Sequence, residues 1–247
     1  MSSPEKLLSA LENSVHWYDA LCEAHGVPGE RHAAFWINRR RMPPYMSNLV
    51  TLTDGADAEA QLDALRSLQA AGVACGVKDS FQCLQLAGLG MRVLFDATWL
   101  YRPAGRASVA AETALTWKVV RTPADLRAWE RAWRGVPDNG DAPEDAVVFR
   151  EALLYRSDFR FLLAERDGEN VAVAALNRSA DAVGLSNVFG ASVEPSELFP
   201  GCVQLAQELF PRAALVGYER GAHLDAAVGA GFEAVHGLRV WVPSDSA

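Results

Sequence analysis

The chain has 247 residues, a formal net charge of −8 at pH 7, and half of its residues are hydrophobic. That composition is ordinary for a globular protein and is enough to form one large domain or two smaller ones. The excess of acidic residues predicts no nucleic-acid partner, because a phosphate backbone is bound by a basic face.

The sequence contains no apolar run of about 18 residues, so we expect no transmembrane helix and no membrane partner. The first residues lack the apolar core of a signal peptide and lead into an amphipathic pattern instead. The four cysteines form no CxxC pair, and no histidine stands at metal-ligand spacing from them. We therefore predict a cytoplasmic protein without a metal site.

Apolar spacing and turn residues divide the chain into alternating helices and strands. The first half predicts, in order, a helix over 4–25, a strand over 48–53, a helix over 58–71, a strand over 73–77, a short helix over 81–87 and a long strand over 91–101. The second half predicts a strand over 116–121, a helix over 122–133, strands over 159–165, 170–178 and 183–189, a helix over 200–210, and a final strand, helix and strand. The Asp-Gly pair at 167–168 is typical of a hairpin turn.

An internal similarity connects residues 73–101 with residues 214–242. Both stretches predict a strand, a short helix, a glycine followed by a large apolar residue, and a last strand that carries tryptophan. Gly76 aligns with Gly217 and Gly90 with Gly231, each pair 141 residues apart. We interpret this as a duplication, which changes the expected architecture.

The fold class predicted from these elements is α+β, with a mixed and mostly antiparallel sheet flanked by helices, in tandem. The predicted division is a truncated N-terminal unit over 1–103, a linker over 104–114 rich in small residues, and a C-terminal domain over 115–247. A cleft between such units would be the natural ligand site.

The order of elements over 115–242, with Ala-Ala-Val-Gly-Ala-Gly-Phe at 226–232 before the last strand, resembles the GNAT superfamily of acyl-CoA-dependent N-acyltransferases. The resemblance implies acetyl-CoA as co-substrate and an amine of a small molecule or a protein as acceptor. In that family two central strands separate to expose backbone groups, and amide groups at a helix N-terminus hold the pyrophosphate.

The resemblance places donor binding at the exit of the strand over 183–189 and at the start of the next helix. The residues it implies for this role are Asn187, Val188, Phe189, Gly190, Ala191, Gly201, Cys202 and Arg220. The loop departs from the family pattern because it carries Glu194 and Glu197 and has only one glycine before the helix. Each carboxylate near a pyrophosphate would repel it by roughly 1 kcal/mol.

The catalytic acid of the family is a tyrosine, and Ala227 stands in its place. The nearby residues that can substitute for it are Tyr218, Glu219 and His223; Tyr218 can donate a proton to the thiolate, and His223 can act as a base near neutral pH. Tyr218 at the strand end and His223 on an exposed helix can also have purely structural roles.

The leading hypothesis is an N-acyltransferase that takes an acyl group from acetyl-CoA. The alternative is a non-catalytic descendant that binds a ligand or partner and has lost the pyrophosphate loop. A third possibility, transfer from an aminoacyl-tRNA donor, fits a tandem architecture but conflicts with the net negative charge.

Overall fold

A computed structural model describes residues 1–43, 45–107, 114–135, 147–180 and 182–244. Contacts divide the chain into unit 1, Met1–His16 with Trp99–Val235, and unit 2, Trp17–Thr98 with His236–Ala247. The helices are α1 (Ser3–Ala24), α2 (Ala58–Ala70), α3 (Pro123–Trp133), α4 (Pro195–Leu209) and α5 (Gly221–Gly229), with short 3-10 turns η1 (Gly55–Asp57), η2 (Ala87–Leu89) and η4 (Glu151–Tyr155). The strands are β1 (Glu30–Arg31), β2 (Phe35–Ile37), β3 (Leu49–Thr51), β4 (Val77–Asp79), β5 (Met91–Arg102), β6 (Thr116–Val119), β7 (Phe159–Arg166), β8 (Glu169–Arg178), β9 (Ala182–Phe189), β10 (Ala214–Glu219) and β11 (Glu233–Pro243).

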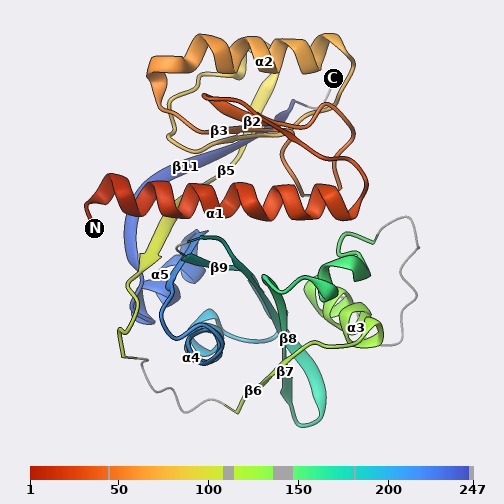
Figure 1. Ribbon diagram of the computed structural model, residues 1–247, viewed down its shortest axis with the longest axis vertical. Helices are drawn as coiled ribbons and strands as arrows, with labels where there is room; N and C mark the ends of the chain where they lie inside the picture. The colour runs from red at the N-terminus through yellow and green to blue at the C-terminus, as the bar shows by residue number, and fades with distance from the viewer. Residues whose placement is uncertain (44, 108–113, 136–146, 181, 245–247) are drawn as a thin grey trace. The chain divides into compact units, whose positions relative to one another are not determined.

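In unit 1 the strand order is β5-β10-β9-β8-β7-β6, with β9 and β10 parallel and β6 to β9 antiparallel. Helices α4 and α5 bury their apolar sides on one face of this sheet, around Leu198, Phe199 and Phe232. Helix α3 covers the other face of β7 and β8 (Figure 1), where the buried Trp129 indole donates to the carbonyls of Leu162 and Ala174. The predicted α+β class is confirmed.

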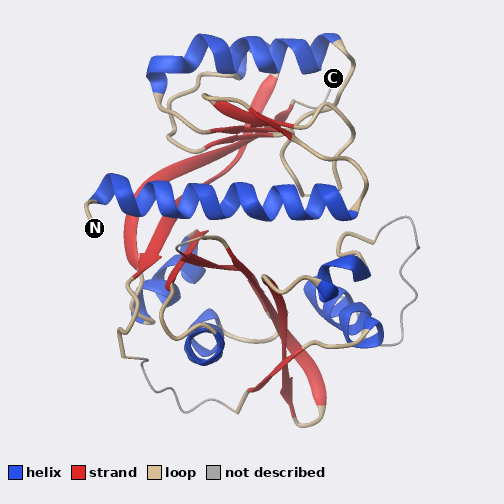
Figure 2. Ribbon diagram, in the orientation of Figure 1, coloured by secondary structure: helices blue, strands red, loops and turns tan. Residues whose placement is uncertain are grey.

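Unit 2 contains the order β1-β2-β3-β4-β11, with β5 next to β11. Strands β3 and β4 are parallel, and α2 joins them and packs on a core that includes Leu65 and Leu68 (Figure 2). The last part of β11 pairs with β4, Trp241 opposite Val77. Each unit therefore contains two parallel strands joined by a helix, β3-α2-β4 and β9-α4-β10.

The division into an N-terminal unit (1–103), a linker (104–114) and a C-terminal domain (115–247) follows from the predicted duplication, and it remains a prediction. The contact units are composed differently, because α1, β5 and β11 each contribute residues to both. Residues 108–113 of the predicted linker lie outside the described residues. The aligned glycines Gly90 and Gly231 both have positive φ, 72° and 95°.

The predicted helix over 81–87 is wrong. The carboxylate of Asp79 accepts hydrogen bonds from the main-chain N–H groups of Phe81, Cys83 and Leu84, which folds the segment into turns. Gln82 takes a left-handed conformation, φ 55°, which a continuous helix does not allow. A side-chain oxygen that competes for backbone donors is the physical reason for the difference.

The first half of α1 is bonded to unit 1 by two buried asparagines. Asn13 Nδ2 donates to the Asn177 carbonyl (2.9 Å) and Ser179 Oγ (3.1 Å), and Asn177 Nδ2 donates to the Asn13 carbonyl (3.1 Å). Gly184 faces this pair, and a Cβ there would lie 2.0 Å from Asn13 Oδ1. The N-terminal turns of the chain therefore belong to the core that contains β8 and β9.

Replacing Asn13 by alanine should lower the free energy of unfolding by about 1–3 kcal/mol, because buried acceptors lose their donor. Urea denaturation measures the change. The control is Ser9→Ala on the same helix, expected within about 0.5 kcal/mol of the wild type. Equal stability of the two variants would show that the asparagine pair does not hold the helix.

Candidate donor and catalytic site

The parallel strands β9 and β10 pair over only part of their length. The paired residues are Ala182–Gly184 with Ala214–Val216, whereas β9 continues to Phe189 and β10 to Glu219. Residues in the paired part are buried, whereas Ser186 and Asn187 on β9 and all of 217–219 on β10 are partly exposed. The two strands therefore do not pair with each other toward their carboxyl ends.

Asn187 lies at a bulge in β9. Its φ is 54°, and the register with β8 shifts between Val173 and Ala175. A bulge leaves one residue outside the ladder and turns the strand locally, and asparagine tolerates this conformation better than most residues. The neighbouring Val188 is buried in the core shared with α4, so only its backbone is available to a ligand.

The loop after β9 is tightly packed at its first residue. A Cβ on Gly190 would lie 2.9 Å from the Val171 carbonyl oxygen and 3.0 Å from the Val193 Cβ, so a larger residue would displace the loop. The Cβ of Ala191 and the ring of Phe189 lie beside Gly135, directly after α3. The small residues here therefore permit close approach of protein segments to each other.

The prediction that the following helix begins at Pro200 is wrong. Helix α4 begins at Pro195, with Glu194 as N-cap in an extended conformation, and Pro200 lies inside it. Proline suits the first helical position because no partner is needed for its missing N–H. Gly201 and Cys202 are thus interior helix residues whose amides face the preceding turn.

The side chain of Cys202 is fully buried, and burial raises the pKa of its thiol well above the usual range. Gly201 serves packing, since a Cβ there would lie 2.3 Å from the Trp117 Nε1 atom. The free N-terminal amides of α4 lie instead near Ser196. The two residues predicted to hold pyrophosphate are therefore misplaced for it.

The two acidic residues of this loop differ in their surroundings. Glu197 forms an ion pair with Arg166 at the end of β7, Nη2 to Oε2 2.6 Å. Glu194 is exposed at the N-cap. Arg166 therefore compensates one of the two carboxylates expected to repel a bound anion. The sequence did not indicate this pair, because Arg166 and Glu197 are 31 residues apart in the chain.

Glu219 closes β10 immediately before α5. Burial raises the pKa of its carboxyl to about 8, and the charge of Arg220 acts in the opposite direction. A carboxyl with a pKa near neutral pH is poised to accept a proton.

His223 lies in the first turn of α5, with its ring 6.4 Å from that of Phe199 on α4. Burial and, secondarily, the charge of Arg220 lower the pKa of its imidazole, which favours the neutral form. Arg220 is the N-cap of α5, without a side-chain capping bond. Arg220 therefore acts electrostatically on both Glu219 and His223, which the structure brings close to one cation.

Tyr218 lies apart from this pair. Its ring makes an edge contact with Trp99 of β5, at 5.4 Å between centroids. Successive residues of a strand point to opposite faces, so Tyr218 and Glu219 lie on opposite faces of β10. Ala227, which replaces the family tyrosine, is buried in the α4–α5 core and has no proton to transfer.

Within the described ranges, no group of three or more His, Cys, Asp or Glu side chains could hold a metal ion. In the same residues, no helix is long and apolar enough to cross a bilayer.

Comparison with solved structures gives the fold family. A GCN5-related N-acetyltransferase from Kribbella flavida superposes with a TM-score of 0.63 at 14% identity, covering 96% of both chains. A GCN5-related N-acetyltransferase from Sphaerobacter thermophilus has a TM-score of 0.53 at 14% identity, over 84% of this chain and 76% of that one. A tandem GNAT protein from the clavulanic acid biosynthesis pathway has a TM-score of 0.52 at 9% identity, over 86% and 79%.

No family model matches the sequence, and no curated protein matches it significantly. At these identities the similarity shows that the chain has the fold of GCN5-related N-acetyltransferases. Because one fold can support many activities, the similarity does not show the activity.

Replacing Glu219 by glutamine should change how stability depends on pH. A raised carboxyl pKa means that the folded protein binds more protons than the unfolded chain between about pH 4.5 and 8, so wild-type stability falls as pH rises through this window. Glutamine does not titrate, so the variant does not lose stability in this way. Between pH 4 and pH 9 the free energy of unfolding of the variant should rise, relative to that of the wild type, by on the order of 2 kcal/mol, after allowance for partial solvent exposure.

Urea denaturation at both pH values measures this gain, with Glu208→Gln on the exposed side of α4 as control. Parallel pH dependence of wild type and Glu219→Gln would mean that the carboxyl is not desolvated.

Proposed function

We propose that the protein is an acyl-CoA-dependent N-acyltransferase whose donor site lies between the carboxyl ends of β9 and β10. The observation that carries the proposal is the short pairing of these strands, three residue pairs followed by half-exposed residues on both. The proposal is supported by the GNAT fold and by a carboxyl of raised pKa at the end of β10.

Backbone groups around Asn187 and Val188 on β9 would hold the pantetheine of acetyl-CoA. The first main-chain amides of α4 would hold its pyrophosphate. Bound there, the thioester supplies an activated acyl carbon. Arg166 already compensates Glu197, so Glu194 is the remaining described carboxylate at this helix start.

Glu219 is the proposed general base, which takes a proton from the attacking amine. Tyr218 is the proposed acid, which returns a proton to the departing sulfur. The attacking nitrogen and the departing sulfur are bonded to the same acyl carbon in the intermediate. Because Tyr218 and Glu219 lie on opposite faces of β10, they can act together only if that carbon lies at the open strand end, within reach of both faces. His223, held neutral at neutral pH, is the second candidate base.

The acceptor is an amine of a small molecule or a protein. The predicted duplication and the parallel strands in both units support a tandem origin in which the N-terminal GNAT-like unit is degenerate. Strands β3 and β4 of unit 2 are buried throughout, which favours unit 1 as the donor-binding unit.

A non-catalytic role is the second candidate, because the loop before α4 has no glycine pair and exposes Glu194 beside the helix N-terminus. The two candidates differ in whether acetyl-CoA binds at all. Calorimetric titration with acetyl-CoA and CoA decides between them: micromolar binding supports the transferase, and no heat at millimolar cofactor rejects it.

The bulge at Asn187 provides a matched pair of variants. Asn187→Gly keeps the left-handed backbone and should bind acetyl-CoA as the wild type does. Asn187→Val strains that backbone by about 1–2 kcal/mol and should weaken binding about tenfold. Equal affinities for the two variants would place the donor elsewhere.

Once an amine acceptor is found, kcat/KM should rise with pH to a plateau above an apparent pKa of about 8, because the base must be ionised. Glu219→Gln should lower kcat about 100-fold or more and abolish this ionisation step. An unchanged profile in Glu219→Gln would exclude Glu219 and direct attention to His223→Gln.

A further inference from the structure

Four arginines gather at the end of the unit 1 sheet that lies opposite the donor site. They are Arg121 after β6, Arg160 near the start of β7, Arg178 at the end of β8 and Arg212 before β10. Three are exposed and Arg160 is half-buried. Among the described residues none of the four has a carboxylate partner, and Arg160 donates only to main-chain carbonyls.

Three of these arginines lie on one face of the sheet. Val119, Leu162 and Leu176 of β6, β7 and β8 pack in the core beneath α4. Because strand residues alternate in direction, the residues two positions away share that face: Arg121, Arg160 and Arg178. Leu176 pairs with Arg160, and the Val120 N–H donates to the Phe161 carbonyl, so the three cations form a row across neighbouring strand ends.

Like charges on neighbouring strands repel each other. The carboxylate of Asp158 in this region does not compensate the row, because it is bonded to Arg156 (2.9 Å) and His16 (3.0 Å). An anionic ligand would remove this repulsion.

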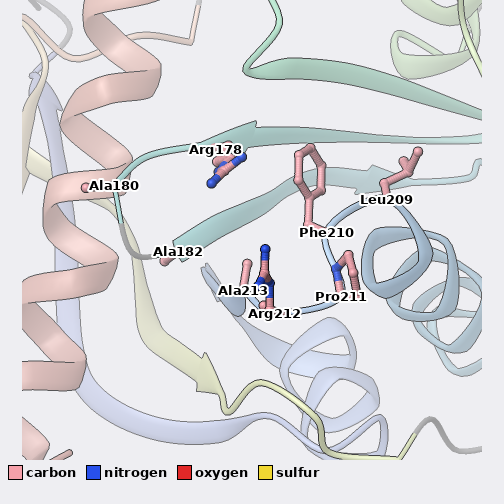
Figure 3. Close-up of a pocket in the computed structure, with 8 residues that line it drawn as sticks. All are labelled: Arg178, Ala180, Ala182, Leu209, Phe210, Pro211, Arg212 and Ala213. Carbon is pink, nitrogen blue, oxygen red and sulfur yellow. The ribbon is translucent and has the colours of Figure 1, made fainter.

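The arginines of the row line two hollows, Arg178 the first and Arg121 and Arg160 the second. One, of about 310 Å³, has Arg178 and Arg212 on opposite walls with Phe210 and Leu209 at one end (Figure 3). The other, of about 290 Å³, is lined by Arg121, Arg156 and Arg160. Both contain apolar side chains beside guanidinium groups, and both have space for a group the size of a nucleobase or a phosphate.

Tyr155 identifies the kind of ligand. It lines the second hollow at the end of η4 and is 79% exposed, although an aromatic ring of this size usually packs. An exposed ring beside arginines offers stacking to a base and bidentate hydrogen bonds to phosphate. Extended acidic peptides would use the cations and leave the ring unused.

We infer that this end of unit 1 binds a nucleotide, with its phosphate on the row Arg121, Arg160 and Arg178 and its base against Tyr155. The nucleotide is either free or the end of a single strand. The total charge of −8 argues against a nucleic-acid partner for the protein as a whole, but screening limits its reach to about 8 Å at physiological salt, so the local charge of the row governs contact.

The experiment is calorimetric titration of the full-length protein with AMP and, separately, with a 5′-phosphorylated trinucleotide. Binding of either ligand supports the site. A trinucleotide that binds at least about tenfold more tightly identifies a strand end as the source, and equal affinities identify a free nucleotide. No binding of either at millimolar concentration overturns the inference.

Arg178→Gln and Arg121→Gln each should weaken binding about tenfold, and Tyr155→Leu should weaken AMP more than inorganic phosphate. Arg40→Gln in unit 2, also exposed, removes the same charge elsewhere and should have no effect. Equal affinity of Arg178→Gln and wild type, or equal binding of a hexaglutamate peptide, contradicts the site.

Acetyl-CoA itself carries a nucleotide, so competition is measured as well. AMP displaced one-for-one by acetyl-CoA would assign it to the donor site and overturn the inference. Because the row and the donor site are at opposite strand ends, Arg178→Gln should bind acetyl-CoA as the wild type does. A protein that binds AMP but not acetyl-CoA would retain this inference and reject the proposed transferase.

Discussion

The partial pairing of β9 and β10 is the constraint on which the rest of unit 1 depends. Two parallel strands that are bonded for three residue pairs hold the sheet together and then do not pair with each other toward their carboxyl ends. The connecting helix α4 must return from the end of β9 to the start of β10, so its N-terminus lies near the opening. Donor binding and proton transfer are therefore proposed at one end of the sheet, and the arginine row occupies the other.

The local charges at the two ends of the unit 1 sheet differ from what the net charge of the chain suggests. Desolvation makes Glu219 a weak acid at the end of β10, and Arg220 beside it partly opposes this effect while favouring neutral His223. At the other end, Arg121, Arg160, Arg178 and Arg212 lie at neighbouring strand ends, and among the described residues none of them is bonded to a carboxylate. A net charge of −8 describes neither location, because electrostatic effects at a site follow the charges within a few ångströms.

Asparagine side chains and glycines set several of the local conformations. Asn13 and Asn177 exchange hydrogen bonds between α1 and β8, and Gly184 leaves the space they occupy. Asn187 adopts the left-handed conformation that creates the bulge in β9. These polar residues are small enough to be buried and able to bond backbone groups, so α1 and the end of β8 meet with the donors of Asn13 and Asn177 bonded.

Apolar periodicity and turn residues act over short distances, so the fold class, most of the helices and strands, and the segment that ends β9 could be predicted from the sequence. It also identified Tyr218, Glu219 and His223 as candidates. It misplaced the start of α4 and the helix over 81–87, where Pro195 and the Asp79 carboxylate decided the outcome. Only the tertiary structure paired Glu197 with Arg166, desolvated Glu219 and aligned Arg121, Arg160 and Arg178, since these effects depend on contacts between residues far apart in the chain.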